Sequence, residues 1–304
     1  MLRTSTFAFA MAATLLAAIS STSLAQDMPL SQILIEGEEW KLVAEGYQFT
    51  EGPAVDAAGN LFFVDVPTSK ILKVDTKSGS VSEFVTDSGK ASGLMFGSDG
   101  RLYACQSANR QVVAYDKEAK PTVIATDLDV NDLVVSRKGD IYVTDYKNSR
   151  VWHISPEGKK QIVDEGIAKP NGVILWPDEQ TLVVSDNAGG SLWAFRIGEG
   201  GKLEHKQPYY TLELGPQKSP SQADGMTVDV AGRLFVATSQ GLQVFDPSAR
   251  LAGILLKPQK KFLSNVAFAG EKLDTLYVTC ADKVYSRKLK TQGISNQHAL
   301  PQPK

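Results

Sequence analysis

Cysteine and histidine are scarce in this chain, which has two cysteines and three histidines among 304 residues. Neither Cys105 nor Cys280 has a cysteine or histidine neighbour at the spacing of metal ligands, so the pattern of a zinc site is absent. A chain of this length buries enough apolar surface to fold without disulfides. His153, His205 and His298 fall in segments expected to be outer strands or the C-terminal tail, where surface or packing roles are typical.

The sequence also lacks an excess of charge, a long apolar run and a serine-hydrolase motif. Lys and Arg total 32 against 34 Asp and Glu, a formal net charge of −2, which argues against nucleic acid as a partner. Beyond the N-terminal segment no stretch approaches the ~18 apolar residues of a transmembrane helix, so we expect no membrane-spanning domain. No G-x-S-x-G phrase is present, which disfavours a serine hydrolase.

The first 25 residues have the pattern of a signal peptide. Arg3 supplies a basic start, residues 7–19 form an apolar segment, and Ser23-Leu24-Ala25 ends in small residues suited to cleavage. We therefore predict a signal peptide over residues 1–25 and a single exported domain over residues 26–304, located in the periplasm or secreted. An uncleaved membrane anchor is the alternative.

A short phrase occurs six times in the chain and consists of a turn followed by a strand of alternating aromatic and aliphatic residues. Its copies begin at Gly59, Gly100, Gly139, Gln180, Gly232 and Asp274. These starts are 41, 39, 41, 52 and 42 residues apart, and a period in the forties made of short strands is typical of propeller blades. The sequence therefore predicts an all-β fold, a six-bladed β-propeller, in which residues 197–223 form a longer outer hairpin and loop.

The same alignment bears on the two cysteines. Cys105 lies five residues after the start of its copy, whereas Cys280 lies six residues after the start of its copy. Adjacent strand positions face opposite sides of a sheet, and the second and sixth blades are not neighbours. A disulfide between the two cysteines is therefore not expected.

Polar residues recur eight to ten residues before each start. The phrases there are Glu51-Gly52-Pro53, Ser92-Gly93-Leu94, Asn131-Asp132-Leu133, Asn171-Gly172-Val173, Asp224-Gly225-Met226 and Ser264-Asn265-Val266. Because the innermost strands of a propeller run along its channel, equivalent positions point toward one axis. Glu51, Asn131, Asn171 and Asp224 are therefore predicted to form a ring of side-chain oxygens.

Two carboxylates and two amides favour a hard divalent cation as the cofactor, most naturally Ca²⁺, with Mg²⁺, Mn²⁺ or Zn²⁺ as alternatives. Asn, Asp and Ser before glycine are also common turn residues, so a purely structural role is the competing interpretation. Four acidic or amide residues at one position of one repeat favour the cation site.

These phrases resemble motifs of the SMP-30/gluconolactonase (LRE-like) family. The resemblance rests on Glu51-Gly52-Pro53 with Phe63-Val64-Asp65, on Asn131-Asp132-Leu133, on Pro170-Asn171-Gly172-Val173 and on Asp224-Gly225-Met226-Thr227-Val228-Asp229, and it spans about residues 45–290. It implies a six-bladed propeller with one catalytic divalent cation in the channel. Glu51, Asn171 and Asp224 then match family metal ligands, and Asn131 matches a position that binds the metal or the substrate.

The resemblance also implies an enzyme that hydrolyses a sugar lactone by attack of water at the cation. Asp224 is the expected general base as well as a metal ligand. The expected substrate contacts are Asn131, Asp132, Gln106, Tyr146 and Arg150, with Asp186 as a further pocket residue. A phosphotriesterase-type hydrolase using the same site and a non-catalytic, calcium-stabilised binding propeller are the alternatives. The expected partner is a small-molecule lactone, and no obligate protein partner is indicated.

Overall fold

Strands make up almost all of the regular structure. The computed structural model describes residues 28–216 and 220–294, and within them the chain forms 24 strands and two short 3₁₀ helices, η1 (Leu30–Gln32) and η2 (Glu199–Gly201). No helix of this described part is long and apolar enough to cross a membrane. The predicted signal peptide and His298 lie outside the described residues.

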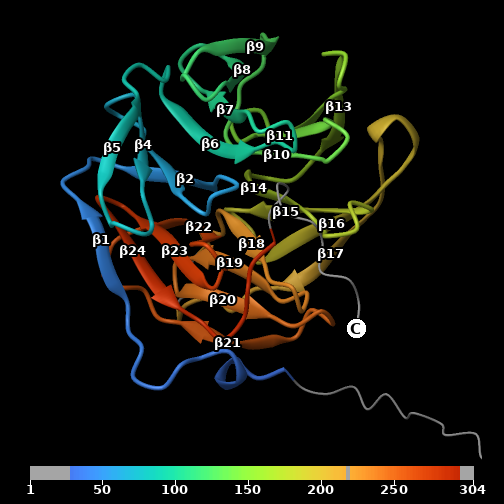
Figure 1. Ribbon diagram of the computed structural model, residues 1–304. Helices are drawn as coiled ribbons and strands as arrows, with labels where there is room; N and C mark the ends of the chain where they lie inside the picture. Colours follow the sequence, from blue (N-terminus) through green and yellow to red (C-terminus); the bar gives the residue numbers. More distant parts are fainter. Residues whose placement is uncertain (1–27, 217–219, 295–304) are drawn as a thin grey trace, which may run out of the picture.

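The strands form six antiparallel sheets of four strands, arranged as blades around a central channel (Figure 1). Blade 1 contains β2 (Thr50–Val55), β3 (Leu61–Asp65), β4 (Lys70–Val74) and β5 (Val81–Val85). Blade 2 contains β6 (Ala91–Phe96), β7 (Leu102–Gln106), β8 (Gln111–Tyr115) and β9 (Pro121–Thr126). Blade 3 contains β10 (Leu133–Val135), β11 (Ile141–Asp145), β12 (Arg150–Ile154) and β13 (Lys160–Glu165).

The second half of the chain repeats this order from the channel outward. Blade 4 contains β14 (Pro170–Leu175), β15 (Thr181–Asp186), β16 (Ser191–Ile197) and β17 (Leu203–Thr211). Blade 5 contains β18 (Met226–Val228), β19 (Leu234–Thr238), β20 (Gly241–Phe245) and β21 (Leu251–Leu255). Blade 6 contains β22 (Leu263–Ala269), β23 (Thr275–Cys280), β24 (Lys283–Lys288) and β1 (Lys41–Glu45). The prediction of an all-β, six-bladed propeller is confirmed.

Blade 6 closes the ring by combining the two ends of the chain. Strand β1 pairs with β24, with Leu42 opposite Tyr285 and Ala44 opposite Val284. In Figure 1 the blue β1 lies beside the red-orange β24. This pairing covers the outer edge of β24 and prevents the first and last blades from separating.

The six repeated phrases of the sequence are the second strands of the blades, and they form most of the core between sheets. In β3, Phe62 and Val64 pack with residues of blade 2, whereas Leu61 and Phe63 pack with residues of blade 6. The exposed fraction of Phe63 and of Val64 is 0%. Alternating side chains therefore fix each blade between its two neighbours, and full burial of such a side chain stabilises the fold by about 1.5–3 kcal/mol.

The wide interval before the fifth copy is occupied as the sequence predicts, by the long outer strand β17 and the turn η2. The Tyr142 hydroxyl of blade 3 donates to the carbonyl of Gly201 at 3.1 Å, so η2 is hydrogen-bonded to the neighbouring blade. Cys105 and Cys280 are buried free thiols, which confirms that they form no disulfide.

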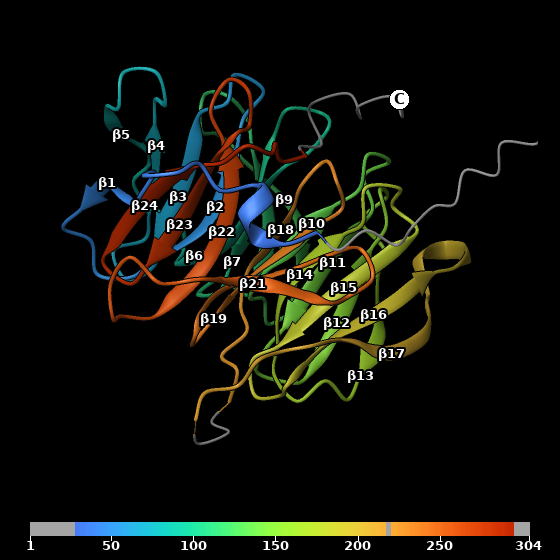
Figure 2. The same cartoon turned by 90° about the horizontal axis from the view of Figure 1, so that it is seen from below.

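A buried ion pair just beyond the end of β18, at the lower end of the channel, contacts both ends of the described chain. Figure 2 shows the N-terminal helix η1, in blue, beside β21 of the same blade. The carboxylate of Asp229 pairs with Arg233 at 3.1 Å and accepts a hydrogen bond from the Thr291 hydroxyl at 2.8 Å. Arg233 also donates to Gln32 at 3.3 Å. The last described residues therefore turn back across this end, and Ile294 lines the channel.

The innermost strands approach one another most closely at their first residues. A side chain at Gly172 of β14 would overlap the main-chain carbonyl of Asp224 in the next blade. Backbone cannot yield as a flexible side chain would, so this position requires glycine.

We expect Gly172→Ala to lower the free energy of unfolding by about 1–3 kcal/mol, because the added methyl group forces the inner strands of blades 4 and 5 apart. Urea unfolding followed by tryptophan fluorescence measures the change. Gly190→Ala is the matched control, because a Cβ there meets only the Leu214 side chain at an ordinary 3.5 Å. Equal stability of the two variants would show that the inner strands can separate at little cost.

Candidate functional site

The six innermost strands are irregular where they begin, at what we call the upper end of the channel. In four blades the pairing with the second strand shifts register between Glu51 and Ala54, Ala91 and Leu94, Pro170 and Val173, and Leu263 and Asn265. In blades 3 and 5 the regular strand starts two residues after Asn131 and Asp224. Such bulges release residues from the ladder and redirect their side chains. The predicted ring residues all lie at these irregular positions.

Asp224 and Asn171 are buried together, with exposed fractions of 5% and 7%. The Asn171 side chain donates a hydrogen bond to the Asp224 carboxylate. When Asp224 is ionised its carboxylate can only accept, so the amide nitrogen of Asn171 is then the donor and the amide oxygen is available as a ligand. The Asn171 main chain is fixed in turn by the Thr144 hydroxyl, which donates to its carbonyl at 2.5 Å.

Glu51 lies across the cluster from these two residues and is held by two donors. Its Oε2 accepts from the Gly52 main-chain N–H and from Nδ2 of Asn265, the latter at 3.0 Å. Burial of its carboxyl group and the charge of Asp132 raise the pKa of Glu51 from 4.5 to about 8. A carboxyl group in this position binds its proton at neutral pH unless a cation replaces that proton.

Asp132 is a third carboxylate in the same cluster. Burial raises its pKa to about 7, although the main-chain N–H groups of Leu133 and Val173 donate to it. The charges of Glu51 and Asp132, after burial itself, raise the pKa of Asp224 well above its ordinary range. Asp132 therefore lies close enough to two members of the predicted ring, Glu51 and Asp224, for its charge to raise the pKa of both carboxyl groups.

Asn131 occupies the predicted register but has weaker links to the cluster. Its main-chain N–H donates to the Thr144 carbonyl at 2.8 Å, and its carbonyl accepts from the Gly93 N–H at 2.9 Å. Its side chain is partly exposed. Among the described residues, no hydrogen bond joins that side chain to the other ring members. Whether it binds metal or substrate stays a prediction.

Sequence reasoning missed one member of the cluster, Asn265. Its side chain is 7% exposed and contacts Glu51 directly. The signal was present, since Ser264-Asn265-Val266 aligns with the other five phrases. It was overlooked because the prediction considered the first residue of each phrase, and in blade 6 the polar contact comes from the second.

The donor set of this cluster fits a divalent cation. Within residues 28–216 and 220–294, no Lys or Arg side chain forms an ion pair with Glu51, Asp132 or Asp224. No three His, Cys, Asp or Glu side chains of this part converge closely enough to hold a metal by themselves. A cation here would draw on amide oxygens as well as carboxylates, a mixture that Ca²⁺ accepts. It would also offset the repulsion among the carboxylates of Glu51, Asp132 and Asp224.

Two of the predicted substrate contacts are engaged within their own blades. Gln106 donates to the Tyr115 hydroxyl at 2.7 Å and accepts from Gln111 at 2.6 Å. Arg150 lies on β12 and pairs with Glu165 of β13 at 3.0 Å. These bonds account for both side chains structurally, and their contact with a substrate stays a prediction.

Tyr146 follows β11 in the turn to β12 of blade 3, and Asp186 is the last residue of β15 in blade 4. The Lys169 ammonium is 4.8 Å from the centre of the Tyr146 ring. Asp186 is buried and accepts from the main-chain N–H groups of Lys169 and Ala188 at 3.0 and 3.2 Å, so it stabilises a turn. Asn187 beside it donates to the Ala223 carbonyl at 3.3 Å and thereby connects this loop to the segment that carries Asp224.

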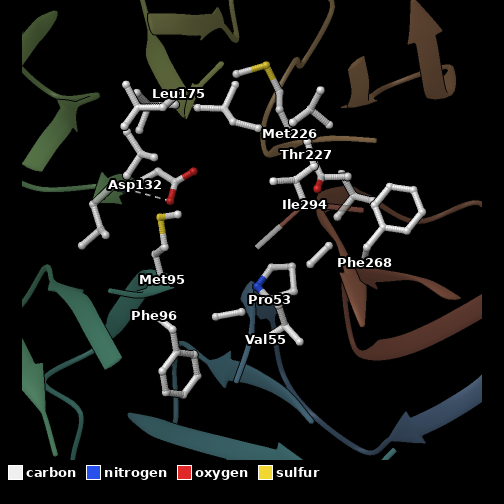
Figure 3. Close-up of a pocket in the computed structure, with 18 of the residues that line it drawn as sticks. Pro53, Val55, Met95, Phe96, Asp132, Leu175, Met226, Thr227, Phe268 and Ile294 are labelled. Atoms are coloured by element: carbon white, nitrogen blue, oxygen red, sulfur yellow. Dashed lines mark hydrogen bonds between the residues drawn. The ribbon is translucent and has the colours of Figure 1, made fainter. Parts of the chain in front are cut away.

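A cavity of about 140 Å³ occupies the channel below the cluster. Figure 3 shows its largely apolar lining, including Val55, Met95 and Phe268. Of the cluster, only Asp132 and Asn265 reach it. The cavity is lined mainly by apolar side chains, with Arg137, Glu179 and Thr227 among them, and Asp132 and Asn265 connect it to the cluster.

The chain is similar to proteins named lactonase and regucalcin. The chain is 26% identical over 303 residues to gluconolactonase of Zymomonas mobilis, covering 87% of this chain and 85% of that protein. It is 24% identical over 230 residues to a pentonolactonase of Haloferax volcanii, covering 73% and 77% of the two chains.

Solved structures share the fold. A putative gluconolactonase superimposes with a TM-score of 0.77 at 23% identity, covering 86% of this chain and 96% of that one. A calcium-binding regucalcin of Agrobacterium tumefaciens gives a TM-score of 0.73 at 16% identity, covering 85% and 96%.

The family comparison is the most direct, because it spans every blade. Residues 49–282 match the model of the SMP-30/gluconolactonase/LRE-like region. The match includes all four predicted ring residues and Asn265. The chain therefore belongs to the SMP-30/gluconolactonase/LRE-like family.

Proposed function

We propose that this protein is a divalent-metal-dependent lactonase that hydrolyses a sugar lactone at the upper end of its propeller channel. The observation that carries the proposal is the cluster in which the buried side chains of Asn171 and Asp224 lie beside the half-buried carboxylates of Glu51 and Asp132, whose charges raise the pKa of Asp224. Its relatives named gluconolactonase and pentonolactonase support a lactone as the substrate.

The cation would be held by Glu51, Asn171 and Asp224, with Asn131 as a further ligand or substrate contact. When bound, it would polarise the lactone carbonyl and stabilise the oxyanion that forms. Ca²⁺ is the cation we favour because every donor is an oxygen, and the calcium-binding regucalcin with the same fold supports that choice.

Asp224 is the residue we assign as the general base. Burial and neighbouring carboxylates raise the pKa of Asp224 in the metal-free protein, and a bound cation would lower it again, so that the carboxylate would be ionised and able to accept a proton. The hydrogen bond from Asn171 fixes the direction in which that carboxylate points. Asp224 takes a proton from the attacking water and returns it to the alkoxide released as the ring opens, so one water molecule and one lactone give one hydroxy acid.

We also propose that the protein acts outside the cytoplasm. The proposal rests on the basic start at Arg3, the apolar segment 7–19 and the small residues ending at Ala25. Export to the periplasm or the medium also suits a calcium enzyme, since free Ca²⁺ is more abundant there than in the cytosol.

Removal of the metal should abolish lactone hydrolysis. Acid release from a panel of sugar lactones, recorded in a pH-stat, is expected to fall to the uncatalysed rate after chelation and to return on addition of Ca²⁺. Glu51→Gln should raise the Ca²⁺ concentration needed for half-maximal activity, because it removes a charged ligand. Undiminished hydrolysis by chelated protein would contradict metal dependence, and hydrolysis of phosphotriesters alone would replace the lactone assignment.

Asp224→Asn should lower kcat by about 10²–10⁴-fold, because an amide cannot accept the proton of water. Calorimetric titration should still detect Ca²⁺, held by the remaining oxygens. The matched control is Asp246→Asn in the same blade, a buried carboxylate that accepts from the Ser248 and Arg250 main-chain N–H groups at 2.8 and 3.0 Å. If both variants kept full activity, the base would have to be another group.

The metal-free protein should lose stability as the pH rises. Folding raises the pKa of Glu51 from 4.5 to about 8, so the folded state binds this proton more tightly than the unfolded state does. The resulting stabilisation is complete below the ordinary pKa and is lost as the pH rises through that interval. Added Ca²⁺ should reverse the trend, because deprotonation then frees a ligand.

Thermal unfolding of chelated and Ca²⁺-loaded protein at several pH values measures both effects. Glu51→Gln, which cannot titrate, should flatten the dependence on pH of the chelated protein. If the melting temperature of this variant fell with pH as steeply as that of the wild-type protein, groups other than Glu51 would cause the dependence.

A further inference from the structure

The innermost strands form two triplets with the same pattern at the second residue of each phrase. Blades 1 to 3 have Gly52, Gly93 and Asp132 there, and blades 4 to 6 have Gly172, Gly225 and Asn265. In each triplet two glycines precede one polar residue. Blades 3 and 6 lie three apart in the ring of six (Figure 1), so Asp132 and Asn265 come from opposite sides of the channel, and both line its cavity.

Asp132 and Asn265 are accommodated in the same way. A Cβ added at Gly93 would overlap the Asp132 side chain, and one added at Gly225 would overlap the Asn265 side chain. Each polar residue therefore occupies the space that the glycine of the preceding blade leaves open. Both are also oriented alike, because Oδ1 accepts the N–H of the next residue at 2.8 Å in each case.

This shared orientation gives Asn265 a task that Asp132 cannot perform. With its Oδ1 used as an acceptor, Asn265 presents Nδ2 as a donor, and Nδ2 lies 3.0 Å from Oε2 of Glu51. Among the described residues, hydrogen bonds to the Glu51 carboxylate reach only Oε2, and Oε1 accepts none. The carboxylate is therefore held by one oxygen with the other left available.

We propose that Asn265 is a positioning residue of the metal site: it holds Oε2 of Glu51 so that Oε1 serves as a one-oxygen ligand of the cation. This inference rests on the proposed function, since it concerns the same site. Asn265 does not itself bind the cation. A role limited to packing is the competing interpretation, and it predicts a loss of stability without a specific effect on Glu51.

The test compares cation binding by the purified full-length mature protein and by Asn265→Ala. A hydrogen bond to a charged group contributes about 1.5–3 kcal/mol, so the Ca²⁺ dissociation constant measured by calorimetry should rise about 10- to 100-fold. Europium luminescence lifetimes, which report water bound to the ion, should show about one additional water molecule as Glu51 disengages. Asn265→Leu, which keeps the volume, gives a second reading if the alanine variant folds poorly.

Two comparisons separate positioning from packing. Gln243→Ala removes another buried amide, which donates to the Glu213 carbonyl at 2.8 Å, and should lower the melting temperature without changing Ca²⁺ affinity. In a Glu51→Gln background, Asn265→Ala should change affinity by no more than about twofold, because the two residues act together.

The outcomes distinguish this inference from the proposed function. If the wild-type protein binds Ca²⁺ and hydrolyses lactones while Asn265→Ala keeps its affinity and its europium lifetime, the inference is overturned and the function stands. An equal loss of affinity from Asn265→Ala in both backgrounds would also overturn it in favour of packing. If the wild-type protein binds no divalent cation, the proposed function and the inference both fail.

Discussion

Six strands can meet at one end of a propeller channel only where most of them carry no side chain, and this steric limit determines the composition of the site. Gly172 lies against the main chain of Asp224, and Gly52 lies against the carbonyl of Ser92. The register of pairing breaks at both glycines: Gly52 and Pro53 are unpaired in blade 1, and Asn171 and Gly172 are unpaired in blade 4. Function and packing are therefore coupled at the same positions: the glycines allow convergence, and convergence brings the polar side chains together.

That convergence forces carboxylates into a place with little water. Glu51, Asp132 and Asp224 each have a raised pKa, and burial is the largest cause for all three. Such a group costs stability in the metal-free protein and gains a favourable interaction when a cation enters. The fold tolerates the cost because the core between blades and the pairing of β1 with β24 do not depend on the site. Stability and cation binding are thus supplied by different parts of the molecule.

The repeat made the fold predictable, since the six phrases each became the second strand of a blade. The spacing of the phrases also predicted the longer outer hairpin and loop of residues 197–223. The position of each cysteine in its strand predicted that the two would not form a disulfide. The ring was predictable only to the level of the first residue in each phrase. Asp132 and Asn265 differ from glycine at the second residue, and periodicity alone does not show that this position also faces the cluster. For Asn265 that fact depends on a bulge in the pairing of β22, and for Asp132 on its place before the regular strand β10; neither feature leaves a mark in the pattern of apolar residues.

The sequence also does not show where the lining of the channel changes from carboxylates and amides to mainly apolar side chains. Above Asp132 and Asn265 the channel is lined by carboxylates and amides, and below them it is lined by side chains such as Val55 and Phe268. The lower part is further narrowed by Ile294, which arrives there because Thr291 is fastened to the buried pair of Asp229 and Arg233. A sugar lactone carries hydroxyl groups that would lose hydrogen bonds in an apolar passage. The proposed substrate is therefore better matched to the carboxylates and amides of the upper end than to the lower cavity, where Ile294 of the anchored C-terminal segment adds a further apolar side chain.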